Sequence, residues 1–223
     1  MLALRNELGN RHPFIVENGS VICFEGVTDS LPGGPHADEF LGPPRAHVRE
    51  LLDRLRGEQG YRFESFGDWS ARQIALATGL PLERAELAGE RLSSEPLQWQ
   101  DTPERLEAFA ATLDRHKLTL TRGGRFHHVL GRAADKGRAL ERLVARYRAA
   151  FPERSFVTVA LGDSPNDTSM LEVADIPVVV EAASGKRLAP GKPALFVAPG
   201  PAGWNEAVQL ILDGRYRARL SGS

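Results

Sequence analysis

Residues 156–167 constrain the fold of this chain more than any other stretch, and they read Phe-Val-Thr-Val-Ala-Leu-Gly-Asp-Ser-Pro-Asn-Asp. An apolar run rich in β-branched residues ends at Gly162, and Asp163, Asn166 and Asp167 follow at once. Ligands of open α/β sheets bind outside the carboxyl ends of the strands. Two carboxylates and an amide at such an edge suit a hard cation such as Mg2+. The alternative is a Gly-Asp turn with Asn and Asp helix caps, because turns and caps use the same residue types.

The composition excludes several classes of protein. With 223 residues and a formal net charge of −1, the chain is long enough for one large domain or two small ones. A charge near zero points to neither a nucleic-acid partner nor a membrane partner. No apolar run approaches a membrane span and no signal peptide is recognisable, so we predict a cytoplasmic protein. Cys23 is the only cysteine, which rules out an internal disulfide or a thiolate metal site.

The first two thirds of the chain predict a mixture of strands and helices. Residues 1–9 are typical of a helix end with Gly9 as its stop. Apolar runs on either side of Asn18-Gly19 predict a β-hairpin. Residues 25–44 are rich in Gly and Pro and are interpreted as a connection without strand or helix. The middle of the chain then predicts an α+β module. One expected helix begins near Pro44, a second covers 69–77 with Asp68 as its cap, a third covers 81–88, and a fourth begins near residue 103. The expected strands cover 61–66, 94–99, 118–121 and 125–130.

The last third changes character, because strands alternate with helices. Expected helices cover 136–149, 167–173 and 202–212, and expected strands cover 156–161, 176–180 and 195–197. This alternation predicts a parallel sheet with right-handed crossovers. The first two strands are continuously apolar, as strands buried on both faces should be.

Two further groups are candidates for binding an anion. Lys136 follows Asp135 at a helix start, where the helix N-terminus favours anions and a lysine adds a charge suited to phosphate. The alternative for Lys136 is a solvated helix residue. Arg122 and Arg125 flank a Gly-Gly turn and could clamp a phosphate or a carboxylate, or they could simply be exposed on a hairpin. His127 and His128 alternate faces in the next strand, so at most one of them faces a site.

The order of these motifs resembles a known family of enzymes. The strings that carry the resemblance are Ile15-Val-Glu-Asn-Gly-Ser20, Ser94-Glu-Pro96, Thr121-Arg-Gly-Gly-Arg-Phe126, Asp135-Lys-Gly137 and Leu161-Gly-Asp-Ser-Pro-Asn-Asp167. Together they resemble the haloacid-dehalogenase-type phosphatases of the Cof-like subgroup with a C2-type cap, and within these the mannosyl-3-phosphoglycerate phosphatase family. The resemblance implies an α/β fold, with a Rossmannoid parallel-sheet core and an inserted α+β cap. The core would comprise residues 1–24 and 131–223, and the cap, which sets substrate specificity, residues 25–130.

The resemblance also implies roles for individual residues. Asp163 and Lys136 would be catalytic: Asp163 would bind Mg2+, with Asn166 and Asp167 completing the metal site, and Lys136 would neutralise the transferring phosphoryl group. The substrate would be a small phosphorylated glycoside. The residues expected to bind it are Asn18, Gly19, Ser94, Glu95, Arg122, Gly123, Gly124, Arg125 and Lys136.

One departure from the family pattern concerns the nucleophile. The family uses the first Asp of an Asp-x-Asp pair near its N-terminus, whereas no Asp precedes Asp29 here and no Asp-x-Asp occurs in the 223 residues. We therefore expect a core without its first strand, helix and second strand, an N-terminal truncation, and little or no activity in the chain as written. A glucosyl-3-phosphoglycerate or other sugar-phosphate substrate stays open, as does a non-catalytic relative that binds a phosphosugar or a partner chain. The sequence leaves the oligomeric state undetermined.

Overall fold

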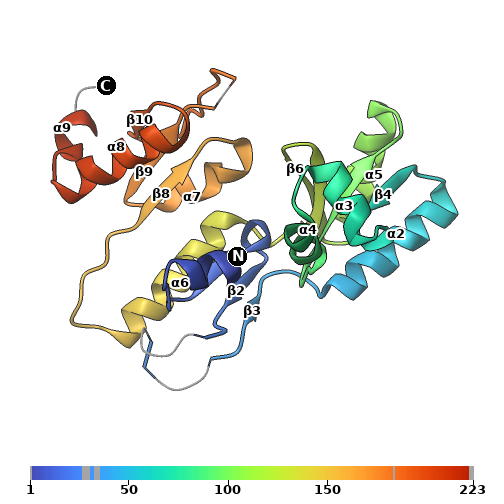
Figure 1. The fold of residues 1–223 in the computed structure, drawn as a ribbon, viewed down its shortest axis with the longest axis horizontal. Helices are drawn as coiled ribbons and strands as arrows, with labels where there is room; N and C mark the ends of the chain where they lie inside the picture. The colour runs from blue at the N-terminus through green and yellow to red at the C-terminus, as the bar shows by residue number, and fades with distance from the viewer. Residues whose placement is uncertain (1, 27–30, 33–35, 183, 221–223) are drawn as a thin grey trace. The chain divides into compact units, whose positions relative to one another are not determined.

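The computed structural model describes residues 2–26, 31–32, 36–182 and 184–220, with the backbone alone for 2–4 (Figure 1). The chain forms two compact units, and each is described by itself. Unit 1 comprises Phe14–Glu25 and His36–Ala134, and unit 2 comprises Leu2–Pro13, Gly26, residues 31–32 and the described residues from Asp135 onward. The hairpin expected in the core segment 1–24 is thus grouped with the middle of the chain. The assignment of core and cap to 1–24, 25–130 and 131–223 stays a prediction.

Unit 1 is an α+β module, as the sequence predicts. It contains a three-stranded antiparallel sheet of order β1-β2-β3 and a four-stranded antiparallel sheet of order β4-β5-β7-β6. Its elements are β1 Phe14–Val16, β2 Val21–Cys23, β3 Glu39–Phe40, α2 Arg45–Gln59, β4 Phe63–Ser65, α3 Ala71–Thr78, α4 Leu82–Gly89, β5 Ser94–Trp99, α5 Pro103–Arg115, β6 Leu118–Gly123 and β7 Phe126–Gly131.

The main core of unit 1 lies between the four-stranded sheet and helices α2 and α5. Helix α2 contributes a stripe at i, i+3, i+4 and i+7, and helix α5 contributes two side chains that are fully buried. The sheet supplies Phe63, Leu97, Leu118 and Val129, and the helices supply Val48, Leu51, Leu52, Leu55, Phe109 and Leu113. Helices α3 and α4 close a second, smaller cluster around Phe66, Ile74 and Ala85.

Two local predictions in unit 1 are wrong. Residues 39–40 of the expected connection form β3, which pairs with the open edge of β2; residues 27–30 and 33–35 of that connection lie outside the described residues. Helix α3 is capped by Ser70 and not by Asp68, because Ser70 and Gln73 form a capping box. The side chain of Asp68 accepts instead from the backbone and hydroxyl of Ser65. Both decisions depend on which partner lies nearby and not on residue type.

Unit 2 is built on a parallel sheet, which confirms the predicted fold class. The strand order is β10-β9-β8, and both pairings are parallel. Val179 packs with α7 on one face, whereas Val178 packs with α8 on the other, so β9 is covered on both sides. The elements are α1 Leu2–Glu7, α6 Lys136–Ala150, β8 Val159–Gly162, α7 Thr168–Val173, β9 Ile176–Val180, β10 Leu195–Val197, α8 Gly200–Leu212 and α9 Tyr216–Leu220.

Strand β8 begins later than its apolar run suggests. We predicted a strand from residue 156 that is buried on both faces, but the side chains of Val157 and Val159 are 65% and 38% exposed. The backbone N–H and hydroxyl of Thr158 both donate to the carboxylate of Asp175, at 2.8 Å each. The N–H of Thr158 is thus bonded to a side chain, whereas its carbonyl still accepts from the backbone N–H of Ile176 at 2.9 Å. Within the described ranges, no helix is both long and apolar enough to cross a membrane.

Candidate active site

The turn after β8 brings the carboxylates predicted for metal binding to the carboxyl edge of the parallel sheet. β8 ends at Gly162, a single 3-10 turn covers Pro165–Asp167, and α7 follows directly. The hydroxyl of Ser164 and the carboxylate of Asp167 form a capping box around this turn. The segment is therefore a capped turn, and this turn also positions the carboxylates that were predicted to bind a metal ion.

Asp167 lies at the centre of this edge and is only 5% exposed. Its Oδ2 accepts from the backbone N–H groups of Asp163 and Ser164, both at 3.1 Å, and from the Ser164 hydroxyl at 2.9 Å. Its Oδ1 accepts from Nζ of Lys136 at 2.5 Å. Lys136 is the first residue of α6, whose N-cap Asp135 accepts from the N–H of Arg138. The ion pair thus joins two of the predicted motifs, which are 31 residues apart.

The electrostatics of Asp167 favour its ionised form. Burial by itself would raise the pKa of Asp167, but the hydrogen bond and charge of Lys136, together with the bonds from Ser164, outweigh burial and lower that pKa. At neutral pH the pair is therefore a carboxylate and an ammonium group. The ammonium of Lys136, whose side chain is 27% exposed, is held in place by Asp167. Within the part of the chain that the structure describes, two of its three donors remain for another anion.

Asp163 differs from Asp167, because its side chain is exposed and makes no hydrogen bond or ion pair within the described residues. It lines a cavity of about 470 Å³ together with Gly162, Asp167 and Trp204. The third predicted metal residue, Asn166, has its Oδ1 bonded to the Ser164 hydroxyl at 2.6 Å. In the part of the chain that the structure describes, no three His, Cys, Asp or Glu side chains gather closely enough to hold a metal ion.

Gly162 allows the close approach of Asp167, and we expect Gly162→Ala to destabilise the fold by about 1–3 kcal/mol. A Cβ at residue 162 would lie 2.4 Å from Cβ of Asp167, so the turn would have to shift. Urea denaturation measures the effect. Gly57→Ala is the matched control: Gly57 lies inside α2 with open space around it, and the same change there should stabilise by roughly 0.5–1 kcal/mol. Equal effects at the two positions would contradict the prediction.

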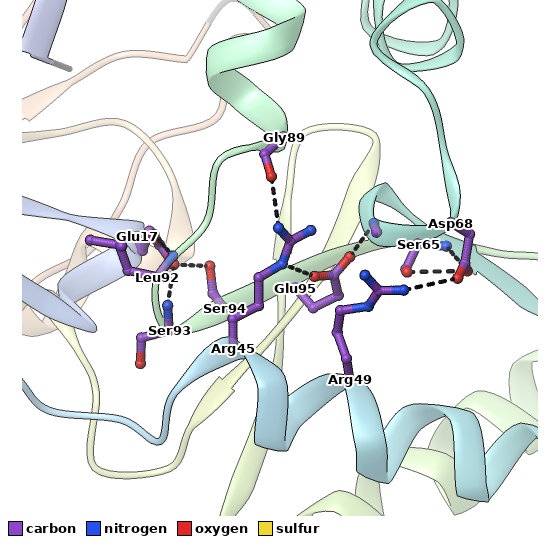
Figure 2. Close-up of polar contacts among 11 residues, drawn as sticks. Glu17, Arg45, Arg49, Ser65, Asp68, Gly89, Leu92, Ser93, Ser94 and Glu95 are labelled. Carbon is purple, nitrogen blue, oxygen red and sulfur yellow. Dashed lines mark hydrogen bonds and ion pairs between the residues drawn. The ribbon is translucent and has the colours of Figure 1, made fainter.

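In unit 1, the carboxylate of Glu17 organises the segment that precedes β5 (Figure 2). It accepts from the N–H groups of Leu92 and Ser93, at 2.7 and 3.0 Å, and from the Ser94 hydroxyl at 2.6 Å. Glu17 and Asn18 both have positive φ, at 53° and 56°, a conformation that is strained for residues other than glycine. The predicted substrate residues Asn18 and Ser94 are therefore neighbours through Glu17, and the Ser94 hydroxyl is already committed to it.

Glu95 is fully buried, and both of its carboxylate oxygens are engaged (Figure 2). Oε2 accepts from Nε of Arg45 at 2.6 Å, and Oε1 accepts from the N–H of Gly67 at 2.6 Å. Arg45 also donates to the carbonyl of Gly89 at 2.8 Å, so Glu95 ties α2, the turn after β4 and the end of α4 to β5. This geometry favours a positioning role. The assignment of Ser94 and Glu95 to substrate binding stays a prediction.

The Gly-Gly turn between β6 and β7 presents its two arginines differently. Arg122 is exposed, whereas Arg125 donates to the carbonyl of Thr78 at 2.5 Å. Arg125 also lines a cavity of about 440 Å³, together with Trp69, Gln98 and Phe126. At the turn itself, Gly124 has a φ of +60°, which favours glycine. Gly123 leaves room for the ring of His128, because a Cβ there would lie 2.9 Å from Nε2 of that ring.

The stability of unit 1 should depend on the titration of His128. Burial, and then the charge of Arg91, lower the pKa of His128 to about 4. Between about pH 6.5 and 4 the unfolded chain binds a proton that the folded chain does not. The free energy of unfolding therefore decreases as the pH is lowered, on the order of 1.4 kcal/mol per pH unit. We expect that in His128→Asn the free energy of unfolding, measured with urea, changes much less between about pH 6.5 and 4. His47→Asn, at an exposed position of α2, should leave the slope unchanged. An unaltered slope in His128→Asn would contradict this account.

Sequence reasoning did not find Glu17 and Arg45 as organisers of this region. Glu17 stands in the quoted Glu-Asn-Gly string, but nothing in the string shows that its carboxylate reaches residues 92–94, which follow more than 70 positions later. Arg45 is the first residue of an amphipathic helix and carries no local signal for a buried ion pair. Both roles arise from contacts between distant segments.

The fold is that of a haloacid dehalogenase-like hydrolase, and the model of that family matches residues 91–189. The glucosyl-3-phosphoglycerate/mannosyl-3-phosphoglycerate phosphatase of Persephonella marina is 32% identical over 94% of this chain and 79% of its own length. The phosphatase of the same name from Methanococcoides burtonii is 33% identical over 93% of this chain and 78% of its own. The chain therefore belongs to the glucosyl-3-phosphoglycerate/mannosyl-3-phosphoglycerate phosphatase family. Among solved structures, a haloacid dehalogenase-like hydrolase from B. subtilis shares the fold, with a TM-score of 0.55 and 21% identity over 88% of this chain and 78% of that one.

Proposed function

We propose that the protein is a Mg2+-dependent phosphatase that hydrolyses mannosyl-3-phosphoglycerate to mannosylglycerate and phosphate. The observation that carries the proposal is the Lys136–Asp167 ion pair beside the exposed carboxylate of Asp163, at the carboxyl edge of a parallel sheet. Phosphoryl transfer depends mainly on positioning and on charge stabilisation. A lysine held by a buried carboxylate, next to a cavity, supplies such a fixed positive charge.

The chain's own residues divide this work. Lys136 would contact the phosphoryl oxygens with the two N–H donors that Asp167 leaves free. Asp167 would orient Lys136 and the turn that carries Asp163. Asp163 would hold Mg2+, which supplies further positive charge to the phosphoryl group when bound, and Asn166 would support that site. The donor set fits in part, because Asp163 presents an unengaged carboxylate to the cavity, whereas both oxygens of Asp167 already accept hydrogen bonds.

The substrate class rests on unit 1 and on the relatives. Arg125 stands at a cavity that also contains Trp69, Gln98 and Phe126, and aromatic faces with amide and guanidinium groups suit a sugar that carries an anion. The substrate-binding set Asn18, Gly19, Ser94, Glu95, Arg122, Gly123, Gly124, Arg125 and Lys136 is proposed on this basis. A glucosyl-3-phosphoglycerate or another sugar phosphate is the alternative substrate, because the names of both relatives include both sugars.

A second candidate function follows from the absence of Asp-x-Asp in the 223 residues. The family resemblance assigns the nucleophile to that pair, so we infer that these residues alone bind the phosphosugar but turn it over slowly or not at all. We also propose that the protein acts in the cytoplasm.

Phosphate release from the two glycosyl-3-phosphoglycerates, with and without Mg2+, tests the proposal. The purified 223-residue chain should show little turnover. A chain extended by any in-frame codons upstream of Met1 that encode Asp-x-Asp should show Mg2+-dependent turnover, which Lys136→Ala abolishes. Clear turnover by the 223 residues alone would rule out the non-catalytic alternative. If an extended, folded chain hydrolyses neither compound, the proposed substrate class is wrong.

A further inference from the structure

Arg91 is an arginine that the catalytic and substrate-binding assignments leave unused. It lies between α4 and β5, directly before the segment that Glu17 holds. Its side chain is half-buried, and its Nε is buried without a hydrogen-bond partner. Among the residues that the structure describes, Arg91 makes neither a hydrogen bond nor an ion pair. A buried charged donor without a partner costs free energy, so its retention calls for an explanation.

The two carboxylates whose charges act on Arg91, those of Glu17 and Glu95, already accept hydrogen bonds from other groups. Glu17 takes three donors from residues 92–94, and Glu95 takes Arg45 and a backbone N–H. Burial lowers the pKa of Arg91, and the charges of Glu17 and Glu95 act against that lowering without forming a contact. Because an arginine stays protonated in proteins, the guanidinium is a cation in need of an anionic partner.

Two further polar groups lie on the strands next to Arg91. The charge of Arg91 is one of the causes that lower the pKa of His128, so Arg91 acts electrostatically on this histidine. His128 is paired with Thr121 across β6 and β7, so their side chains project from the same face of the sheet. Oγ1 of Thr121 is also buried without a hydrogen-bond partner. Arg91 and Thr121 thus each carry a buried donor without a hydrogen-bond partner among the described residues, and Thr121 lies beside His128 on the sheet.

We propose that Arg91, with Thr121 and His128, binds the carboxylate of the substrate's glycerate group and makes that carboxylate a requirement for recognition. The inference rests on the proposed function for the identity of the ligand, but the anion site itself rests on the unpaired donors. Arginine suits this role because its planar guanidinium donates two parallel hydrogen bonds to a carboxylate. Glu17 then acts as a positioning residue, since it fixes residues 92–94 and with them the start of the Arg91 side chain.

The test is a titration of the full 223-residue chain, observed by NMR at the arginine Nε–H resonances. The probes are mannosylglycerate, its neutral methyl ester and D-glycerate. Arg91→Lys identifies the resonance of Arg91 by its disappearance, and the backbone spectrum shows that each variant is folded. Arg91→Gln removes the charge, and Arg72→Gln, at an exposed position of α3, is the matched control.

We expect the Nε–H resonance of Arg91 to shift with both acids and not with the ester. Arg91→Gln should weaken binding of mannosylglycerate about 10- to 100-fold, as loss of a charge-assisted hydrogen bond does, with a smaller loss in Arg91→Lys and none in Arg72→Gln. Unchanged affinity in Arg91→Gln, or no shift of the Arg91 resonance with any acid, overturns the inference and leaves the proposed function intact. If the variant weakens D-glycerate and mannosylglycerate equally, and the sugar adds no affinity, the anion site stands and the proposed substrate fails.

Discussion

Replacing Asp167 with asparagine is expected to destabilise unit 2 by about 2–4 kcal/mol, because it breaks a buried ion pair and leaves Lys136 facing an amide. The remaining oxygen of the asparagine still serves the donors that surround Oδ2, so the turn itself is preserved. Urea unfolding measures the loss. Amide exchange in β8 and α7 assigns it to unit 2, since local opening reports the stability of each region.

Asp163→Asn is the matched control for this prediction. Asp163 is exposed and lies four residues away, so its replacement should change stability by no more than about 0.5 kcal/mol while removing the carboxylate proposed for Mg2+. Since the pKa of Asp167 is lowered in the folded state, its stabilising effect is complete above about pH 4 and is lost as the pH falls further. Asp167→Asn should lack this acid-sensitive component. Equal losses of stability in the two variants would refute the distinction between a buried positioning carboxylate and an exposed ligand.

Glu95→Ala is expected to destabilise unit 1 by about 3–5 kcal/mol. The substitution leaves the guanidinium of Arg45, which is 20% exposed, without its carboxylate, and the N–H of Gly67 without an acceptor. Four elements lose a common anchor, so amide exchange should accelerate in β5, in the turn after β4 and at the near ends of α2 and α4. Urea denaturation gives the magnitude.

A double variant separates the ion pair from packing. Arg45→Met with Glu95→Leu removes both charges, and it should recover much of the stability lost in Glu95→Ala, because apolar side chains of similar volume often replace buried pairs without loss. Glu86→Ala, at an exposed position of α4, should stay within about 0.5 kcal/mol of the parent. If Glu95→Ala unfolds at the same urea concentration as Glu86→Ala, the buried pair does not stabilise unit 1.

Local patterns in the sequence predicted most of the secondary structure. The apolar spacing of α2 and α5, the glycine stops and the turn residues all act over a few positions, and most elements lie close to their predicted ranges. No range was predicted for β3 or for α9. The wrong predictions concern short segments whose structure depends on a neighbouring segment. β3 has only two residues and exists because β2 offers it an open edge, whereas the start of β8 was displaced by hydrogen bonds to the side chain of Asp175.

The candidate site was predicted to a different depth in each unit. In unit 2, the family resemblance implied that Lys136 and Asp167 belong to one site, and the structure joins them in one ion pair. Their catalytic and metal-binding roles stay predictions. In unit 1, the sequence singled out Ser94 and Glu95 without revealing that both are bonded to groups of the protein itself. Residue type could not distinguish a carboxylate that binds substrate from one that supports a turn, because the same oxygens perform both tasks.

The sequence by itself determined most of the elements, the alternation that produces a parallel sheet, and the motifs by which the chain belongs to its phosphatase family. These depend on short-range periodicity, turn chemistry and residue identity, all of which are present in the linear order of the chain. The tertiary structure alone decided which charges are buried and which remain available. Glu17, Glu95 and Asp167 each accept a hydrogen bond from a group 28 to 77 residues away, whereas Asp163 and Arg91 are left unpaired among the described residues. Burial and pairing result from packing between distant segments, and that packing exists only once the chain has folded.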